Sequence, residues 1–432
     1  MGSGKSNGKS GVLGWYFKTS LLVRILIGLI GGAVVGLIVG PPIEVIEPLG
    51  RLFVRLLQMI VVPVILFTLI VGAASVSPAR LGRIGVKTVV LYLLTSAIAI
   101  GLGLVMGNVF RPGEGMDIGQ VEEGVAREAE APALVDTLLE IVPTNPFQAI
   151  AGAEVLQIIF FAILFGIGLS YLQISETERV KSAGDLMFRF FDGGAEIMYR
   201  IVGWVLQYAP IGVFALIAVV FGTQGAEAFG PLAIVTLAVY LAIVLHFLIV
   251  YGGLLKMSGY SLFKFVRRGR EAMITAFVSR SSGGTLPVTI RNVEHNMGVK
   301  RPVFAFSLPL GATINMDGTA IYMGVAVLFV ANAIGVPLTL VQQLMVVLTA
   351  VLASIGTAGV PGAGAIMLLL VMNTVGLPVE EGSPQALAYG MILGIDALLD
   401  MGRTGLNVSG DMAVTCLVAK SEKEVDLTKW ES

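Results

Sequence analysis

The chain has 432 residues, of which 56% are apolar and 13% are charged. Because an average soluble domain is about 25% charged, this composition excludes an ordinary soluble enzyme. The 28 Lys and Arg residues are balanced by 29 Asp and Glu residues, which excludes a basic nucleic-acid-binding face. The single cysteine, Cys416, excludes a disulfide within the chain and a multi-thiolate metal site. About 20 apolar residues cross a bilayer as a helix, so the composition predicts an all-α polytopic membrane protein.

Six apolar stretches are predicted to span the membrane before the pattern changes. They lie at 21–40, 52–74, 88–110, 155–172, 201–221 and 231–255. Lys and Arg gather before the first span and in alternate connections after it, whereas the other connections are acidic or uncharged. Because positive residues stay on the cytoplasmic side, we expect a multi-pass protein of the plasma membrane with both termini in the cytoplasm.

Two later segments are too rich in Gly, Ser and Pro to be continuous spanning helices. They are 279–287 and 354–364, and apolar helix-forming residues flank each of them. Irregular backbone at membrane depth persists only where protein or a water-filled cavity satisfies its polar groups, and a pair of such segments is typical of transporter sites. The basic flanks of the first segment, 264–271 and 291–301, belong on one side, which predicts a re-entrant hairpin. The alternative is a pair of Gly-kinked spans.

Polar side chains also interrupt the last apolar stretches. The run 315–319 (Asn-Met-Asp-Gly-Thr) lies inside the apolar segment 303–334. In the final span, charged and amide side chains recur at i, i+4, i+7, i+11 and i+15 and so form one helical stripe. The stripe consists of Asp396, Asp400, Arg403, Asn407 and Asp411. Ionisable residues at this depth are costly and by default mark a functional site. The alternative is a structural ion-pair network without a ligand.

The chemistry of these groups suits binding rather than bond breaking. The planar guanidinium of Arg403 matches a carboxylate bidentately, and Asp400, one turn away, can accept from an α-amino group. Free backbone N–H groups at the tip that contains Ser281 and Ser282 can hold an α-carboxylate. Oxygen ligands select a hard cation rather than zinc or copper, and the remaining oxygen-bearing groups are Asp317, Asp411 and Asn315.

A membrane enzyme is the competing class. The only histidines, His246 and His295, lie in an apolar span and in a basic loop, which leaves a serine nucleophile without a general base. An aspartyl protease would need two acids that share a proton, as Asp317 and Asp400 could. The charge of Arg403 would keep such carboxylates ionised, so we expect that the protein is not an enzyme.

These motifs resemble the glutamate/aspartate:sodium symporters, a family of dicarboxylate and amino acid:cation symporters, and especially its archaeal sodium-coupled aspartate transporters. The resemblance covers about 21–420 and is carried by Asn315-Met316-Asp317-Gly318-Thr319, Arg280-Ser281-Ser282, the glycine-rich tip 354–364 and Asp400-Met401-Gly402-Arg403-Thr404. It implies eight transmembrane helices plus two re-entrant helical hairpins, an elevator-type mechanism and a homotrimer.

The resemblance also implies a division into a scaffold and a transport domain. The expected segments are a disordered tail (1–11), scaffold helices one and two (12–82), helix three of the transport domain (83–111), an extracellular acidic loop (112–134), scaffold helices four and five (135–222), the rest of the transport domain (223–420) and a cytoplasmic tail (421–432).

Site residues are carried over in the same way. Arg403 is expected to bind the substrate side-chain carboxylate and Asp400 the amino group. The other implied substrate contacts are Arg280, Ser281, Ser282, Thr319, Val360, Gly364, Thr404 and Asn407. Three sodium sites are implied: one at Gly311, Asn315, Asn407 and Asp411; one at Thr313, Met316, Ser354, Ile355 and Thr357; and one at Tyr92, Thr95, Ser96, Asn315 and Asp317.

The sequence departs from the family pattern at four positions. Gly283 replaces a serine of the hairpin tip, Gly405 replaces a bulkier residue, and Leu91 replaces one of two tyrosines. Met323 stands where the archaeal members have Gln and the proton-coupled animal members have Glu, so no carboxyl is available there for proton cotransport. The resemblance therefore predicts symport of an acidic amino acid with about three Na+. L-Aspartate is the first expectation and glutamate the second, and a neutral amino acid carrier is the alternative within the family.

Overall fold

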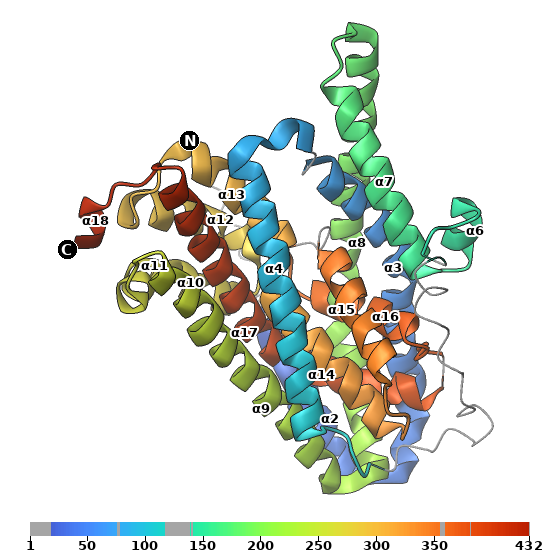
Figure 1. The fold of residues 1–432 in the computed structure, drawn as a ribbon. Coiled ribbons are helices and arrows are strands. Elements are labelled where there is room, and N and C mark those ends of the chain that lie inside the picture. The colour runs from blue at the N-terminus through green and yellow to red at the C-terminus, as the bar shows by residue number, and fades with distance from the viewer. Residues whose placement is uncertain are drawn as a thin grey trace, which may run out of the picture.

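The computed structural model describes residues 19–75, 78–116, 139, 141–354, 359–380 and 382–431. These residues form helices and one isolated antiparallel bridge, Val299–Val425, without a strand (Figure 1). The helices are α2 (Leu21–Val39), η1 (Pro41–Ile46), α3 (Glu47–Ser75), α4 (Pro78–Phe110), α6 (Pro146–Ala151), α7 (Val155–Gln173), α8 (Glu178–Gln224), η2 (Gly225–Ala228), α9 (Phe229–Leu245), η3 (His246–Tyr251), α10 (Gly252–Met257), α11 (Leu262–Ser279), α12 (Ser282–Arg291), η4 (Asn292–Asn296), α13 (Arg301–Ile314), α14 (Asp317–Ala333), α15 (Leu340–Ser354), α16 (Ala363–Thr374), α17 (Pro384–Ser421) and α18 (Thr428–Glu431). The all-α prediction is confirmed for this part of the chain.

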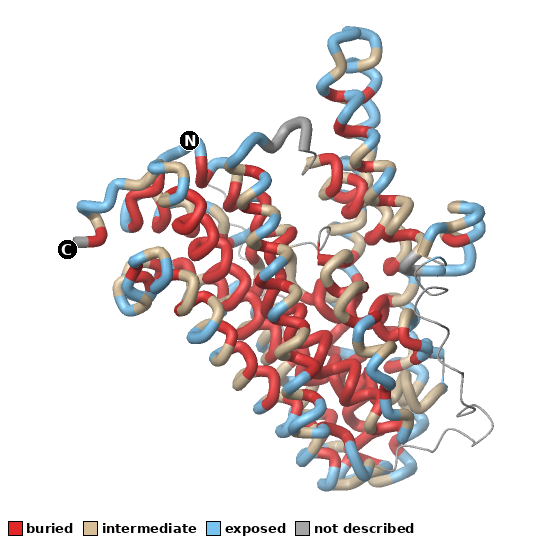
Figure 2. Tube along the Cα trace, in the orientation of Figure 1, coloured by how far each residue is buried: buried red, intermediate tan, exposed pale blue. Residues whose placement is uncertain are grey.

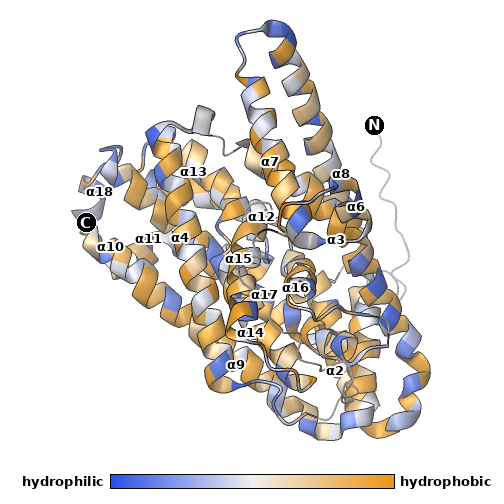
Figure 3. Cartoon of the chain, turned by 45° about the vertical axis from the view of Figure 1, so that its right-hand side comes forward, coloured by the Kyte–Doolittle hydropathy of each residue, from blue (hydrophilic) through white to orange (hydrophobic). Residues whose placement is uncertain are grey.

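Several helices have the length and composition of membrane spans. Among the described residues, five helical stretches are long and apolar enough to cross a bilayer: Leu21–Val39, Pro41–Ser75, Gly82–Phe110, Glu178–Met257 and Arg301–Ala333. Their outer faces carry large exposed apolar side chains, such as Ile38 at 78% and Val109 at 68%, and Figure 3 shows apolar colouring along the outer helices. Such a surface is typical of a protein surrounded by lipid and is consistent with the predicted polytopic membrane protein.

Glycines allow α2 to pack directly on α8. A Cβ atom at Gly28, Gly32 or Gly36 would lie within 2.5 Å of the carbonyl oxygens of Pro210, Phe214 and Ala218, respectively. The glycines on α2 and the residues that they meet on α8 both recur every four residues, so one face of α2 runs along one face of α8. Small residues at this spacing bring membrane helices into backbone contact. Helices α3 and α7 pack onto the same unit.

A second group of helices surrounds α14 and α17. A Cβ atom at Gly103 of α4 would lie 2.4 Å from Ile321 O of α14, and one at Gly318 would lie 2.4 Å from Arg403 O of α17. Nearly every residue of α14 is buried, and Figure 2 shows buried chain through the centre of the molecule. Polar residues on these two helices are therefore held away from lipid.

Helix α8 extends well beyond the predicted span. The sequence predicts a span at 201–221, whereas α8 runs without interruption from Glu178 to Gln224. Its first part is rich in charged residues and projects with the end of α7 beyond the other helices (Figure 1). The apolar stretch therefore indicates where the helix becomes apolar enough for a bilayer, and the helix itself begins earlier.

The segment 279–287 forms a helix–tip–helix hairpin, but its tip is shorter than predicted. The break covers only Arg280 and Ser281, and α12 already begins at Ser282. The reason is a helix cap: Ser281 Oγ accepts from Gly284 N at 2.9 Å, which satisfies a free N–H of the first turn. Away from the tip, Arg291 at the end of α12 is paired with Glu271 of α11. The two helices therefore lie side by side along the hairpin. Helices α15 and α16 form the arms of the second predicted hairpin.

Candidate functional site

The candidate site lies where four parts of the chain meet. These are the non-helical link between α13 and α14, the polar stripe of α17, the α11–α12 tip and the start of α16. The helix is interrupted at this link because Asn315 and Met316 have non-helical backbone angles. It exposes backbone polar groups deep inside the protein, where they need partners.

The guanidinium of Arg403 is the centre of the first cluster. The side chain is fully buried, with Nη1 2.8 Å from Asp396 Oδ1 and Nη2 2.9 Å from Asp400 Oδ1. Its Cζ atom lies 4.0 Å from the centroid of the Tyr322 ring. Among the described residues, Arg403 Nε has no hydrogen-bond acceptor, and the Nη2–Asp400 pair lacks hydrogen-bond alignment. A buried guanidinium with unused N–H groups fits a further planar anion.

Both hairpins reach this cluster. Gly362 N donates to Asp400 Oδ2 at 3.3 Å, and a Cβ atom at Gly364 would lie 2.8 Å from Arg403 Nη1. The tips also contact each other, because Ser281 Oγ donates to Gly359 O at 2.8 Å and Gly283 N donates to the same oxygen at 3.0 Å. These contacts join two segments far apart in sequence, and the start of α16 lies against the guanidinium.

Arg280 terminates α11 in a left-handed conformation with φ 55°. A non-glycine residue pays about 1–3 kcal/mol for such backbone and commonly does so at a functional site. Its side chain is buried and lines a small cavity of about 30 Å³ together with Gly362 and Asp396. The first hairpin therefore places a second cation beside the carboxylates of α17.

The carboxylate of Asp317 is the centre of the second cluster. Ser96 Oγ donates to Oδ1 at 2.6 Å, while Tyr251 OH donates to Oδ2 at 2.5 Å and His246 Nε2 lies 3.0 Å from Oδ2. All four side chains are inaccessible to solvent. Thr95 and Tyr92 lie on the same helix as Ser96, and their hydroxyls donate to backbone oxygens. The cluster is rich in oxygen atoms that suit a hard cation.

The carboxylate of Asp411 is the centre of the third cluster. Asn315 Nδ2 donates to Asp411 Oδ1 and to Asn407 O, both at 3.0 Å. A Cβ atom at Gly311 would lie 2.4 Å from the same Oδ1, so α13 can pass only because this residue is glycine. In the part of the chain that the structure describes, Asn315 Oδ1 is buried without a hydrogen-bond partner. An unpartnered buried oxygen beside a carboxylate fits the ligand set of a cation.

The side chain of Asn407 connects the clusters. Its Oδ1 accepts from Gly318 N at 2.7 Å, and its Nδ2 lies 3.2 Å from Met316 Sδ and 3.5 Å from Thr319 Oγ1. Helix α17 thereby fixes the first turn of α14. The substrate and cation positions that the sequence predicts therefore share this side chain.

Most of the predicted site residues come together. The set that lies around the three clusters is Tyr92, Thr95, Ser96, Arg280, Ser281, Ser282, Gly311, Asn315, Met316, Asp317, Thr319, Gly364, Asp400, Arg403, Thr404, Asn407 and Asp411. Val360 is half-buried at the second tip. Thr313 and Ser354 donate their hydroxyls to Leu310 O and Val351 O of their own helices. The predicted ligands Ile355 and Thr357 lie outside the described residues, as do 1–11 and most of the loop 112–134.

Sequence reasoning missed the partners of Asp317 on η3. This segment is a π-helix, in which residues five apart are aligned because of its i→i+5 hydrogen bonds. His246 and Tyr251 are five apart, and their ring centroids are 4.9 Å from each other. The signal in the sequence was a histidine and a tyrosine in an otherwise apolar span, but the α-helical period does not align them.

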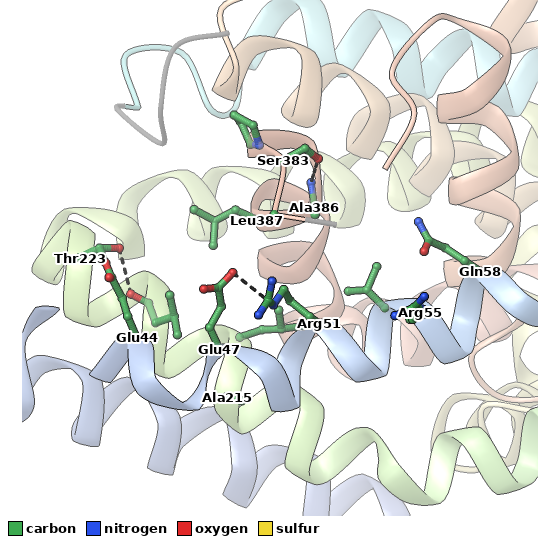
Figure 4. A pocket seen from close by; sticks show the side chains of 15 residues that line it. Glu44, Glu47, Arg51, Arg55, Gln58, Ala215, Thr223, Ser383, Ala386 and Leu387 are labelled. Carbon is green, nitrogen blue, oxygen red and sulfur yellow. Dashed lines mark hydrogen bonds and ion pairs between the residues drawn. The ribbon is translucent and has the colours of Figure 1, made fainter. Parts of the chain in front are cut away.

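A cavity of about 640 Å³ lies away from these clusters (Figure 4). It is bounded by the start of α3, by α8 and by the start of α17, and it contains the ion pair between Glu47 and Arg51 at 3.7 Å. None of the predicted site residues lines it. It is a crevice between the two helix groups, and its size alone does not mark the site.

Comparisons with known proteins show which sequences this chain resembles. The model of the sodium:dicarboxylate symporter family matches residues 21–421. The chain is 36% identical to the proton/glutamate-aspartate symporter of Escherichia coli (strain K12), over 90% of this chain and 87% of that protein. It is 34% identical to the proton/sodium-glutamate symport protein of Geobacillus stearothermophilus, over 95% and 97%. The C4-dicarboxylate transport protein of Bacillus subtilis (strain 168) is 31% identical over 95% of each chain.

Proposed function

The chain belongs to the sodium:dicarboxylate symporter family, and we propose that it imports an acidic amino acid together with sodium. Its family and its relatives are cation-coupled symporters of acidic substrates and not enzymes, which confirms both the resemblance and the expectation that the protein is not an enzyme. Within this class, L-aspartate is the proposed substrate and glutamate the second candidate.

The observation that carries the proposal is the unfilled hydrogen-bonding capacity of Arg403. Asp396 holds Nη1, whereas Nε has no acceptor among the described residues. A substrate side-chain carboxylate would supply the missing acceptors. Asp400, which already contacts Gly362 N, is positioned to accept from the substrate amino group. A neutral amino acid would leave the guanidinium unfilled, at a cost of about 1–3 kcal/mol for each unsatisfied buried group.

The amino-group contact separates an amino acid from a plain dicarboxylate. Asp400 is buried next to a site for an anion, where it would repel a second substrate carboxylate unless a positive group lay between them. A protonated amine provides that group and a succinate-like substrate does not. We therefore place an acidic amino acid ahead of the C4-dicarboxylates that one relative's name indicates.

Sodium is the proposed coupling ion, and the donor sets fit it. The Asp317 and Asp411 clusters offer hydroxyl, amide and carboxylate oxygens, and Thr313, Met316 and Ser354 are the described members of a further set. Some relatives are named for proton coupling. Met323 is buried on α14 and gives this chain no acid at the position where the animal members carry one.

Charge balance supports about three sodium ions per substrate. The site holds four acids, Asp317, Asp396, Asp400 and Asp411, and two guanidiniums, Arg280 and Arg403. Two negative charges remain, and the substrate adds a third. Each uncompensated charge at membrane depth costs about 3 kcal/mol or more, so roughly three cations would make the loaded site neutral.

The proposed mechanism is an elevator. The group of α2, α3, α7 and α8 corresponds to the expected scaffold segments 12–82 and 135–222. The helices around α14 and α17 correspond to the expected transport segments 83–111 and 223–420. We propose that the second unit moves against the first within a homotrimer, with both chain termini in the cytoplasm.

Uptake in proteoliposomes tests the function. Labelled L-aspartate is offered under an inward sodium gradient, under a proton gradient alone, and under neither, with unlabelled glutamate, succinate and alanine as competitors. We expect uptake only with sodium, strong competition by glutamate or aspartate and weak competition by succinate and alanine. Uptake that needs only the proton gradient would refute the sodium assignment, and equal competition by succinate would refute the role of Asp400.

A further inference from the structure

An apolar groove of about 390 Å³ lies on the outer side of the contact between α9, α11 and α17. Its walls include Leu248 of η3 at 51% exposure, Ile274 at 62% and Phe277 of α11 at 38%. Helices α9 to α11 form an outer edge of the molecule (Figure 1). In a membrane, the medium that meets this groove is lipid.

The groove is open because residue 405 has no side chain. A Cβ atom at Gly405 would lie 3.7 Å from the Phe277 ring, an ordinary contact, so packing does not require a glycine here. At Gly402, by contrast, a Cβ atom would lie 2.8 Å from the Tyr240 ring. Gly405 therefore leaves space on the outer side of α17, where it lines the groove.

Two basic residues stand at one end of the groove. Arg267, Arg270, Ile274 and Phe277 occupy positions i, i+3, i+7 and i+10 of α11, which places them on one face of the helix. Arg270 precedes Phe277 by seven residues, about 10 Å along the helix axis. Both arginines are exposed and line a basic recess of about 280 Å³. Among the described residues, neither arginine has an ion-pair partner.

From this arrangement we propose that the groove binds an anionic phospholipid. The phosphate lies against Arg267 and Arg270, and one acyl chain extends between α9 and α11 as far as Gly405. Charge complementarity identifies this occupant: an apolar groove that ends in two unpaired guanidiniums matches a molecule with an apolar chain and a negative head. A zwitterionic phospholipid would fill the same groove but lacks the net charge, which is worth about fivefold in binding for each basic residue near the surface.

The site would link lipid composition to one arm of the first hairpin. Helix α11 leads to the tip that contacts Gly359, and its outer face forms the groove. A lipid held there stays with the hairpin and with α17 rather than exchanging freely with the bilayer. The proposal requires only that these helices lie in a membrane and is independent of the substrate.

Fluorescence quenching by brominated lipids tests the proposal on the full-length protein. The variant Leu248→Trp places an indole at the groove, and subtraction of the parent's signal isolates it. Vesicles contain phosphatidylglycerol or phosphatidylcholine with brominated chains. We expect phosphatidylglycerol to bind about 25-fold more tightly than phosphatidylcholine at this indole, since each of the two arginines contributes about fivefold.

Two further variants decide the outcome. In the Leu248→Trp protein, Arg267→Gln with Arg270→Gln should remove the preference, so that phosphatidylglycerol and phosphatidylcholine bind about equally. The matched pair Arg179→Gln with Lys181→Gln, exposed on α8, should preserve it. Gly405→Leu, whose Cβ would make only ordinary contacts, should fill the groove and weaken quenching by both lipids. Equal binding of both lipids by the parent, or a preference that survives removal of both arginines, would overturn the proposal.

Discussion

Asp396 and Arg403 lie two turns apart on α17, and their Oδ1 and Nη1 atoms are 2.8 Å apart in a region where Arg403 has no solvent exposure. This contact fixes one edge of the guanidinium, and among the described residues Nε has no acceptor. In the proposed function, Asp396 orients Arg403 toward the substrate and does not itself contact the substrate.

Arg403→Cys should abolish most of the affinity for acidic substrates. A buried charge pair that loses one partner costs about 2–5 kcal/mol, and removal of the guanidinium also opens space for small neutral amino acids. Binding of aspartate and of alanine is measured by calorimetry in detergent. Arg179→Cys, at an exposed position on α8, is the control. If Arg403→Cys binds aspartate within a few-fold of the parent, Arg403 is not the ligand.

Asp317→Asn and Asp411→Asn should each weaken sodium binding and flatten the dependence of substrate affinity on sodium. Each substitution removes one negative charge from an oxygen-rich cluster but retains a side chain of similar size. The measurement is the slope of log affinity against log sodium concentration, which should be near three for the parent and about one unit lower for each variant. The exposed Asp192→Asn serves as a control. A parent slope near one would contradict the charge balance.

Gly32→Ala should destabilise the α2–α8 contact, whereas Gly31→Ala should not. A Cβ atom at Gly32 would lie 2.5 Å from Phe214 O, while at Gly31 the nearest atom is 3.6 Å away in the Phe214 ring. Overpacking against backbone costs about 1–3 kcal/mol. Thermal unfolding in detergent compares the two neighbours directly. Equal unfolding midpoints for both variants would show that α2 and α8 can move apart without a loss of stability.

The pair between Lys87 and Glu422 should make stability depend on pH. The hydrogen bond from Lys87 holds the pKa of the Glu422 carboxyl below its ordinary value, and the charges of Arg83 and Lys87 act in the same direction. A lowered pKa in the folded protein stabilises it at neutral pH, and this contribution is lost as the pH falls through the folded-state pKa.

Glu422→Gln should therefore lower the unfolding midpoint at pH 7. Its difference from the parent should shrink as the pH falls below the ordinary glutamate pKa of about 4.3 and disappear below the lowered folded-state pKa. Glu176→Gln, exposed before α8, controls for a general charge effect. A difference that is the same at pH 7 and at pH 3.5 would mean that the pair contributes nothing through ionisation.

The sequence was sufficient to predict features that depend on residues close together in the chain. Apolar stretches placed α2, α7 and the continuous α9–η3–α10 stretch within about two residues, because a bilayer demands a minimum length of apolar helix. Helices α3 and α4 begin about five and ten residues before their predicted spans. The helical period placed Asp396, Asp400 and Arg403 on one stripe, and Arg403 is paired with both carboxylates. Boundaries were less accurate where a helix continues into water, as α8 does, since apolarity and helicity end at different residues.

By itself, then, the sequence determined the membrane class, the broken segments and the polar residues that they carry, because hydrophobic length and backbone-breaking composition act within one segment. Only the tertiary structure decided which polar groups meet. The pairing of His246 and Tyr251 with Asp317 depends on a π-helical turn, and the contact of Ser281 with Gly359 joins residues 78 positions apart. Such contacts follow from how helices pack on each other, and the periodicity of a single helix does not contain that information.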